Sequence, residues 1–378
     1  MALTIVAQPP SIALANSPML FDLHSADNAE AGHKYTLKVW IWNGTTASQP
    51  TDPTFTLTKS PNSAGKALFD VSRLVREKLE ATKVSELVDT STTTNADDDV
   101  YWVQGKASAT WDAGSDAEVD GNTILGTLGY SMYSDGAINA TLTGFPLQNK
   151  LKIHTSSKLM LPVFTSIADE LVITDSASAT KTFSFTANTN TSSRLKFCNV
   201  SPSKFSTYGI ATSGTYTITY KLSSSVVHTA YLEVVCEKKY DPMQLMYLSS
   251  NGSWSFMTFF KASTKTLDAQ RTTYYNSVVD YGSSSVAASY STEQGMRTGY
   301  LSQGYMTHVL NTGYVDESED VRIKQLLLSD SVVLYDGSKF IGVEVVSNSQ
   351  VMQKHKNERV INYTISVKET AGEINKVY

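Results

Sequence analysis

The clearest pattern in the chain is an alternation of side chains over residues 34–42, KYTLKVWIW. Successive side chains of a β-strand point to opposite faces, and the apolar residues of one face are Tyr35, Leu37, Val39 and Ile41. Trp40 and Trp42 fall on the other face. Because both faces carry large apolar groups, we expect protein to cover this strand on both sides.

The period changes after a second predicted strand at 54–59, TFTLTK. Apolar residues then recur at helical spacing, with Asp70 as the expected N-cap, and they are Val71, Leu74, Val75 and Leu79. The polar run at 90–99, TSTTTNADDD, predicts a loop, after which VYWVQGKASATW resumes a strand. Residues 112–150 are rich in Gly and Asp and lack a regular period, so we expect a long surface excursion there.

Short apolar runs separated by turn residues occupy 151–237. They are KLMLPVF, ELVITD, TKTFSFTA, RLKFCNV, TYTITYKL and TAYLEVVCE. This spacing is typical of an antiparallel β-sandwich of about a hundred residues or fewer.

The densest aromatic stretch is LSSNGSWSFMTFFKAS, residues 248–263. Its Asn251-Gly252 pair predicts a hairpin with a two-residue type I′ turn, which needs positive φ at both central positions. That turn would place Ser249 opposite Trp254, Tyr247 opposite Phe256 and Leu245 opposite Thr258. The other face would carry Leu248, Met246, Met257 and Phe259. Both faces are apolar, so we expect this hairpin to be covered on both sides.

A second polar, Gly/Ser-rich excursion is expected at 277–304. Acidic residues at 316–320 then precede an apolar run, which predicts a helix whose first turn carries negative charge. Asp336-Gly337 predicts another hairpin. A last strand, RVINYTISVKE, would turn Ile361, Tyr363, Ile365 and Val367 inward.

These elements predict a mainly β fold of two to three antiparallel β-sandwich-like domains, with a few short helices and long polar loops. The expected N-terminal β domain is 1–150, with one amphipathic helix and a long excursion. The expected β-sandwich is 151–237, and the expected C-terminal β domain, with the aromatic hairpin and one helix, is 238–378.

Composition narrows the class of protein. The net charge of −5 and scattered Lys and Arg argue against a nucleic-acid binder. No apolar run approaches the roughly 20 residues that span a bilayer, so no membrane partner is expected. The chain has only two cysteines, Cys198 and Cys236, too few for a disulfide framework. Free buried thiols are favoured, and whether the two cysteines form a disulfide stays open. The start of the chain lacks a charged signal-peptide region, which favours synthesis in a reducing cytosol.

The sequence singles out no catalytic, cofactor-binding or metal-binding residue. SAGKAL at 63–68 lacks the first Gly and the Ser/Thr of a phosphate-binding loop, and the histidines show no metal-ligand spacing. The aromatic strands could stack on sugar rings, but period-two aromatics favour a core. A glycosidase needs only two carboxylates at a suitable separation, which a sequence does not reveal.

Several motifs together resemble a family of proteins. In order they are ANSPMLFDL, YTLKVWIW, GKALFDVSRLVREKL, VVCEKKYDPMQLMYLSSNGSWSFMTFF, NTGYVDESEDVRIKQLLLSDSVVLY and ERVINYTISVKET. This series resembles structural proteins, of the tail or baseplate type, from tailed bacteriophages and related prophages. The resemblance spans most of the chain and is weak at 85–190 and 277–304. Ser255 stands where the group often has Asp after the hairpin Trp.

The resemblance implies a non-enzymatic virion component built of β domains, assembled in the host cytoplasm with other virion structural proteins. We expect several copies in a ring, with excursions at 86–99, 112–150 and 277–304 as contacts between subunits. The first alternative is a carbohydrate- or receptor-binding module of a phage fibre, which would expose Trp254, Trp102 and Trp111. The second alternative is a glycan hydrolase of the particle.

Overall fold

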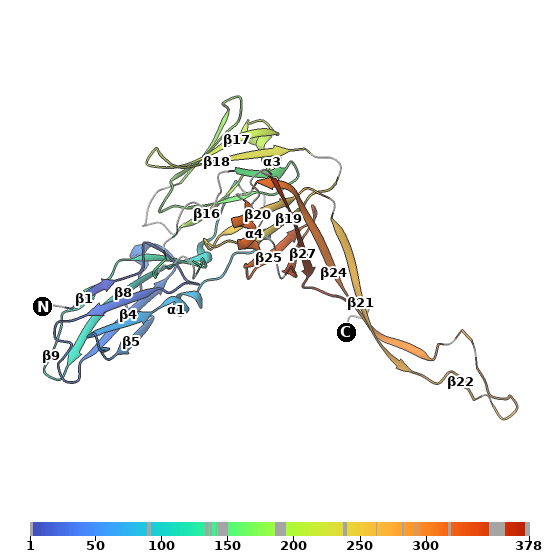
Figure 1. Ribbon diagram of the computed structural model, residues 1–378, viewed down its shortest axis with the longest axis horizontal. Coiled ribbons are helices and arrows are strands. Elements are labelled where there is room, and N and C mark those ends of the chain that lie inside the picture. The colour runs from blue at the N-terminus through green and yellow to red at the C-terminus, as the bar shows by residue number, and fades with distance from the viewer. Residues whose placement is uncertain are drawn as a thin grey trace.

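The computed structural model shows a mainly β molecule with an elongated, bent outline (Figure 1). It describes residues 3–88, 92–132, 136, 138–140, 142, 150–185, 194–236, 240–261, 263–281, 283–290, 292–293, 295–316, 319–347 and 360–374. The N-terminal strands extend to one side of a central body, and a long two-stranded ribbon extends to the other (Figure 1). The mainly β class predicted from the sequence is confirmed.

Two sheets pack face to face in the N-terminal region. The first has the order β1 (Thr4–Ala7), β3 (Leu20–His24), β6 (Lys66–Asp70). The second has the order β2 (Ile12–Leu14), β11 (Ile124–Thr127), β8 (Val100–Trp111), β4 (Lys34–Trp42), β5 (Phe55–Lys59), with β9 (Gly114–Ser115) and β10 (Val119–Asp120) on β8. Apolar side chains from both sheets fill the space between them, among them Phe21, Leu23, Phe69, Leu37 and Val39.

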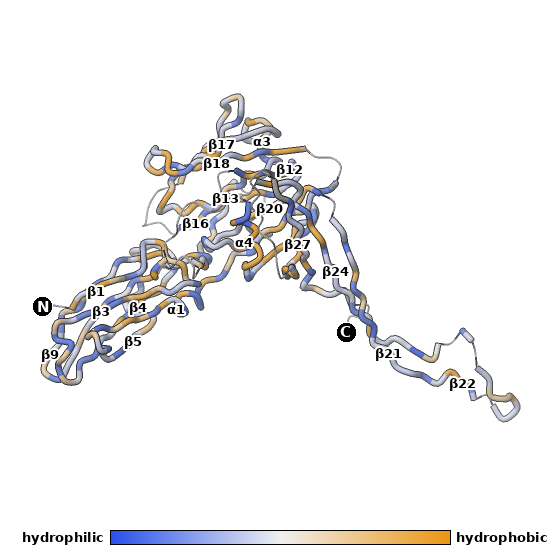
Figure 2. The backbone as a smooth tube through the Cα atoms, in the orientation of Figure 1, coloured by the Kyte–Doolittle hydropathy of each residue, from blue (hydrophilic) through white to orange (hydrophobic). Residues whose placement is uncertain are grey.

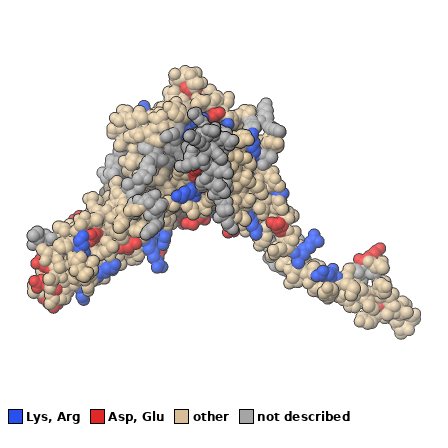
Figure 3. Space-filling model, viewed as in Figure 1, with Lys and Arg blue, Asp and Glu red and all other residues tan. Residues whose placement is uncertain are grey.

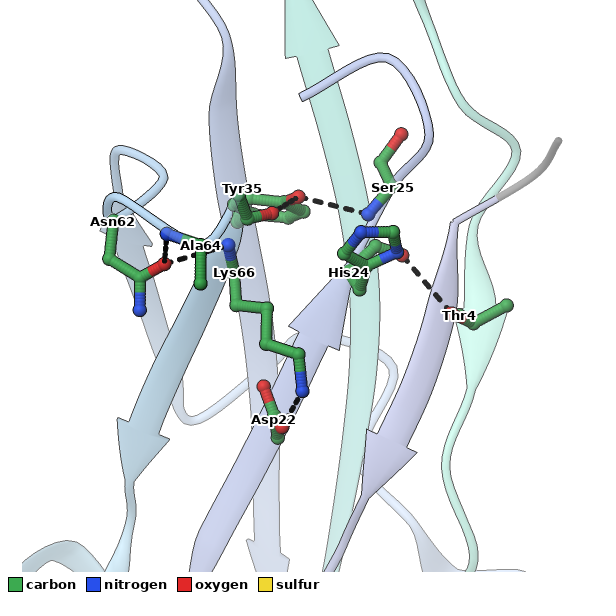
Figure 4. A network of polar contacts seen from close by, with 9 residues as sticks. Thr4, Asp22, His24, Ser25, Tyr35, Asn62, Ala64 and Lys66 are labelled. Atoms are coloured by element: carbon green, nitrogen blue, oxygen red, sulfur yellow. Dashed lines mark hydrogen bonds and ion pairs between the residues drawn. The ribbon is translucent and has the colours of Figure 1, made fainter. Parts of the chain in front are cut away.

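Strand β4 has the two faces that its alternation predicts. Tyr35 and its alternate neighbours lie in the N-terminal core, whereas Trp40 and Trp42 lie in the cluster of the central body. The hydroxyl of buried Tyr35 is also satisfied: it accepts a hydrogen bond from the Ser25 N–H at 2.9 Å and donates one to the Gly65 carbonyl at 2.6 Å (Figure 4). Strand β4 therefore joins two cores, as expected for a strand covered on both sides.

The middle of the chain also forms two sheets. One has the order β12 (Lys150–His154), β18 (Ser225–Val235), β17 (Gly214–Leu222), β14 (Glu170–Thr174), β15 (Thr180–Ser184). The other has the order β13 (Met160–Phe164), β16 (Leu195–Asn199), β7 (Thr93–Asn95). A helix, α3 (Pro202–Tyr208), follows β16. Strand β12 pairs in parallel with β18, and β2 pairs in parallel with β11, which the antiparallel expectation did not include.

Two segments expected to be irregular contain strands. Residues 93–95, inside the expected loop 90–99, form β7 and pair with β16, so an early segment completes a sheet of the middle region. Residues 124–127, inside the expected excursion 112–150, form β11, which is buried between β2 and β8. Part of each expected excursion, 89–91 and most of 133–149, lies outside the described residues.

The C-terminal sheet has the order β20 (Trp254–Phe259), β19 (Met243–Leu248), β25 (Val332–Tyr335), β26 (Phe340–Val345), β27 (Val360–Glu369), β24 (Arg297–Asp316), β21 (Thr264–Tyr275), with β28 (Glu373–Ile374) on β24. The hairpin predicted at Asp336-Gly337 joins β25 to β26. The helix predicted after the acidic run is α4 (Asp320–Leu327). On β27, Tyr363, Ile365 and Val367 are buried as predicted, while the Ile361 side chain lies outside the described residues.

The aromatic hairpin is present, but its predicted register is wrong by one position. Tyr247 pairs with Ser255 rather than with Phe256, and Met246 pairs with Phe256. Ser249 N–H donates to the Ser253 carbonyl at 2.9 Å, so the loop has three residues, and Gly252 alone in it has positive φ, +75°. A three-residue loop with Gly in the left-handed region replaces the type I′ turn.

Contacts with the N-terminal region explain the longer hairpin loop. The Tyr130 N–H donates to the Ser250 carbonyl at 2.7 Å. A side chain at Gly252 would meet the backbone of Leu128 and Gly129. Both faces of the hairpin are buried, as predicted, because Phe256 lies in the central cluster and Met257 lies in the C-terminal core.

The remaining corrections are local. The helix expected from Val71 to Leu79 is shorter: α1 spans Ser72–Arg76, and a second short helix, α2, spans Val84–Leu87. Asp70 does not occupy the N-cap but accepts a hydrogen bond from the Ser72 N–H at 3.0 Å. Both cysteines are free; Cys198 is buried as expected, but Cys236 is exposed.

Candidate interaction surface

The long ribbon of Figure 1 is the feature that most distinguishes this fold, and we call residues 264–308 the arm. It consists of β21, the connecting residues 276–296 and the first part of β24. The two strands pair from Thr264 opposite Val309 to Tyr275 opposite Arg297, with one shift of register between Thr272 and Thr273. At about 3.4 Å per residue, the twelve residues of β21 span roughly 40 Å.

The arm is the part of the described chain with the least protection from solvent. Every residue of β21 is exposed. Large apolar or aromatic side chains are exposed along the arm, and they are Leu267, Tyr274, Tyr275, Val279, Tyr281, Val286, Tyr290, Met296 and Tyr300. In Figure 2 apolar positions on the arm are scattered between polar ones. A two-stranded ribbon without a core of its own is marginally stable, and its strand edges invite pairing with another chain.

The root of the arm is anchored in the C-terminal sheet. The imidazole Nε2 of His308 lies 2.7 Å from Oε1 of Glu369, and both side chains are largely buried. A bulge in β24 follows, between Asn311 and Tyr314, and the Thr312 hydroxyl there accepts a hydrogen bond from the Tyr363 N–H at 3.0 Å. β24 pairs with β27 on both sides of this bulge, from Thr307 to Asn311 and from Tyr314 to Asp316, so the bulge lies within the sheet at the base of the arm.

Charge is unevenly distributed along the arm. The paired strands carry the basic residues Lys265, Arg271 and Arg297 and one acidic residue, Asp268. The connection 276–296 carries Asp280 and Glu293 and no Lys or Arg. Figure 3 shows blue groups along the ribbon and a red group toward its end. We call residues 276–296 the tip; it holds a short strand pair, β22 (Val279–Asp280) with β23 (Ser289–Tyr290).

A pocket of about 240 Å³ lies where β12 of the middle region meets the C-terminal sheet and α4. Its lining residues are Lys152, Met257, Thr258, Phe260, Lys261, Thr312, Gly313, Tyr314, Val315, Glu319 and Arg322. Three of these carry positive charge and one carries negative charge. The described lining thus mixes apolar, hydroxyl and charged side chains.

Arg322 forms the buried end of that charge set. It donates a hydrogen bond to Glu319 at 2.8 Å and another to the Phe256 carbonyl. Burial alone would lower the pKa of Arg322, but the negative charge of Glu319 and the contact with Tyr247 hold that pKa above its ordinary value. The guanidinium therefore stays charged, and it is paired with Glu319 inside the pocket wall.

Lys152 and an aromatic ring already contact one another at this pocket. Its ammonium lies 5.7 Å from the centroid of the Phe260 ring, within the range of a cation–π contact. Tyr314, which is 75% exposed, borders the pocket on the other side. The pocket offers a further ligand both a cation and aromatic surface.

The tryptophans that a sugar-binding face would need are mostly inside the protein. Trp254 and Trp102 are buried, and the indole N–H of Trp254 donates to the Thr82 carbonyl at 2.8 Å. Trp111 is half-buried and stacks on His33 with a ring separation of 5.7 Å. The core interpretation of the aromatic hairpin is the one that the structure supports.

Metal-binding clusters and membrane-spanning helices are both absent from the described residues. Among them there is no group of three or more His, Cys, Asp or Glu side chains placed to hold a metal ion. In the same part of the chain, no helix is long and apolar enough to cross a bilayer.

Sequence reasoning located the arm but misjudged its form. Residues 277–304 were expected to be an irregular excursion, yet 297–304 belong to β24, and β21 precedes them. The signal available was the Thr- and Tyr-rich composition of 264–275, TKTLDAQRTTYY, which favours a strand. The pocket had no such signal, because its lining comes from segments far apart in the chain.

No protein-family model and no curated protein matches the chain. Among solved structures, a crystal structure of Dpr2 Ig1-Ig2 in complex with DIP-Theta Ig1-Ig3 is 6% identical, with a TM-score of 0.17, covering 81% of this chain and 95% of that chain. Domains 1–6 of the surface layer protein SbsC are 11% identical, with a TM-score of 0.19, covering 94% of this chain and 40% of that one. Similarity at this level carries no argument about function.

Proposed function

We propose that this protein is a non-enzymatic structural subunit of a tailed-phage particle, in its tail, baseplate or adaptor region, and that it joins neighbouring subunits through the arm. It would be assembled in the host cytoplasm and act in several copies arranged as a ring, next to other virion structural proteins. The order of motifs that resembles phage tail and baseplate proteins supports the particle assignment.

The exposed arm is the observation that carries the proposed mode of action. Its strands are held to the body at one end, by the sheet pairing and the His308–Glu369 contact, and none of its described residues belongs to a hydrophobic core. Burying its exposed tyrosines and apolar side chains against another subunit would contribute free energy in proportion to the area removed from water. Standard protein interfaces bury about 800 Å² per partner, which a ribbon of this length can supply.

The interior tryptophans favour this role over the alternative of a sugar-binding fibre module. With Trp254 and Trp102 buried, the aromatic hairpin serves to join regions of the protein rather than to contact a ligand.

Cross-linking in intact particles tests the proposal. A photo-reactive residue in place of Ser284, at the tip, should cross-link this chain to another virion subunit in particles purified from the producing host. The same residue in place of Asp52, on the N-terminal region, controls for non-specific cross-linking. Absence of the chain from purified particles, or the same products from both positions, would contradict the proposal.

A further inference from the structure

We infer that the outer edge of β21 pairs with the same edge in a second copy of this chain, so that two arms form one four-stranded antiparallel ribbon. The two-fold axis of this pairing passes between Gln270 of one copy and Gln270 of the other. The inference rests on the proposed role of the arm in assembly and names the partner of the arm.

Strand β21 is an open edge along its whole length. Within the described part of the chain it pairs with β24 alone, and each of its twelve residues is exposed. Figure 1 shows it on the outer side of the arm near the root, beyond β24. Proteins commonly protect such edges with proline, with bulges or with a covering segment. The arm contains no proline, so the edge of β21 has kept its main-chain groups available for pairing.

The one bulge of the arm leaves β21 regular. Thr272 pairs with Leu301 and Thr273 pairs with Gly299, so the extra residue, Tyr300, belongs to β24. A bulge bends the strand that carries the extra residue. The outer edge of β21 therefore continues past this point without a break in its alternation.

Hydrogen bonding at the far end of the arm shows which groups of β21 point outward. The Asn276 N–H donates to the Met296 carbonyl at 2.9 Å, so the main-chain groups of Asn276 face the opposite strand. Main-chain groups of successive residues in an antiparallel pair face alternate sides. Along β21 the odd-numbered residues therefore direct their N–H and C=O groups outward, and they are Lys265, Leu267, Ala269, Arg271, Thr273 and Tyr275.

Pairing about Gln270 uses every one of these outward groups. A two-fold axis normal to the sheet pairs residues whose numbers have a constant even sum, so odd-numbered residues meet odd-numbered residues. The pairs across the axis are Lys265 with Tyr275, Leu267 with Thr273 and Ala269 with Arg271. The six outward N–H groups of each copy then all have a carbonyl acceptor in the other copy.

The side chains of one face fit this register. Lys265 of each copy lies opposite Tyr275 of the other copy, which gives a cation beside an aromatic ring. Tyr275 is 75% exposed, although its own Arg297 lies 5.5 Å from the ring centroid. Leu267, which is 51% exposed, is covered in part by the opposite strand.

The other face also accepts the register. Asp268 lies opposite Thr272 of the second copy, so no two like charges of β21 are directly opposite one another. Asp268 keeps its contact with the Thr307 hydroxyl of its own arm, at 3.4 Å. The two Gln270 side chains meet at the axis, where each amide offers both a donor and an acceptor.

The arm itself favours a second β21 over other occupants of this edge. The outer edge of β24 is partly taken, by β28 at Gln303 and Gly304 and by β27 from Thr307 onward, whereas the edge of β21 is open along twelve residues. A two-stranded ribbon is marginally stable, and further strands stabilise it. Antiparallel pairing also places the two bodies at opposite ends of a ribbon roughly 40 Å long, so the bodies stay apart.

This contact uses the same surface on both copies. Such an isologous interface closes after two copies, so the ring of the proposed function would use other surfaces as well.

Disulfide trapping in the full chain tests the register. C236S removes the exposed native thiol, and Cys198 is buried. Q270C in that background places two thiols at a non-hydrogen-bonded pair, whose Cα atoms are about 4.5 Å apart, within the roughly 4.4–6.8 Å of disulfides. Mild oxidation should convert most Q270C chains into a disulfide-linked dimer on a non-reducing gel.

A269C in the same background is the matched control. The two Ala269 residues are diagonal neighbours in this register, about 7–8 Å apart, which is too far for a disulfide. If A269C forms the dimer as readily as Q270C, or if Q270C stays monomeric, the inference is overturned.

A second pair of variants tests the role of the main chain. A269P removes an outward N–H and leaves the hydrogen bonds between β21 and β24 in place, since proline is tolerated at strand edges. Because the two-fold axis repeats the change, each interface loses two donors, and sedimentation velocity should show association at least about tenfold weaker than that of the wild type. A269V keeps the N–H and should associate like the wild type. Equal association of A269P and the wild type, or equal weakening in both variants, would contradict pairing through the main chain.

The outcomes separate this inference from the proposed function. A wild-type chain that stays monomeric at the highest concentration, with no disulfide from Q270C, overturns the inference; cross-links from position 284 to another virion protein would then still support the role of the arm. Absence of the chain from purified particles overturns the proposed function, whereas trapping of Q270C in solution would still support the pairing of two arms.

Discussion

Replacement of Trp254 by Ala should destabilise the whole body of the protein rather than the C-terminal sheet alone. The side chain is 3% exposed and belongs to a cluster that also contains Trp102 of the N-terminal region and Met160 of the middle region. Its indole N–H donates to the Thr82 carbonyl at 2.8 Å, across 172 positions of sequence.

The magnitude follows from these contacts. Removing a buried Trp side chain costs about 3–5 kcal/mol through lost apolar burial and the cavity left behind. W254F would keep a ring but lose the hydrogen bond and leave the Thr82 carbonyl unpaired, which costs about 1–3 kcal/mol. We therefore expect the free energy of unfolding to fall in the order wild type, W254F, W254A.

Urea unfolding followed by far-UV circular dichroism and by intrinsic fluorescence measures this effect. Because one cluster joins the three regions, both probes should report one shared shift of the midpoint. The half-buried Trp111 provides a matched control, and W111A should change the free energy of unfolding by about 1 kcal/mol or less. A W254A loss below about 1 kcal/mol, or a shift in one of two separate transitions, would refute the reasoning.

Three further outcomes are expected. Replacing 276–296 by Asn-Gly should change the free energy of unfolding by no more than about 0.5 kcal/mol, since no described residue of the tip belongs to a core. A larger loss in urea unfolding would show that the arm supports the body. A maleimide should label one thiol per native chain and two after denaturation, because Cys236 is exposed whereas Cys198 is buried and burial raises the pKa of its thiol. Mass spectrometry counts the labels, and two labels on the native chain would contradict this prediction. D175N should weaken the loss of stability that the protein shows at acid pH. Hydrogen bonds from the Ala211, Ala179 and Ala177 N–H groups lower the pKa of Asp175 in the folded state. The stability that the Asp175 carboxylate contributes is therefore present above the unfolded pKa of about 3.9 and is lost as pH falls through the lower folded pKa. Thermal unfolding at several pH values measures this effect, with D52N as the control. The same dependence of the unfolding temperature on pH in both variants would contradict the reasoning.

Local pattern was a good guide wherever a segment's own periodicity decides its structure. Strand β4 has the predicted bounds, and its two faces enter two different cores. The same holds for the inward face of β27, because alternation fixes which side chains can share a face. Helix α4 also follows from the acidic residues before its apolar run.

The failures share a physical cause. Residues 93–95 have no strand signal of their own and become β7 because the edge of β16 offers hydrogen-bond partners. The hairpin register shifted because the loop around Gly252 is fitted to the backbone of residues 128–130, which the Asn-Gly pair does not encode. In both places the deciding partner lies about a hundred residues away or more.

The sequence by itself determined the β class, the faces of the strongly alternating strands and the apolar character of the aromatic hairpin, since each depends on side chains one or two positions apart. Tertiary structure decided which strands share a sheet, which hairpin becomes an exposed arm, and which lysines gather at one pocket. Those features depend on contacts between distant segments, and the free energy of such contacts comes from burial and backbone pairing that no short window of sequence contains.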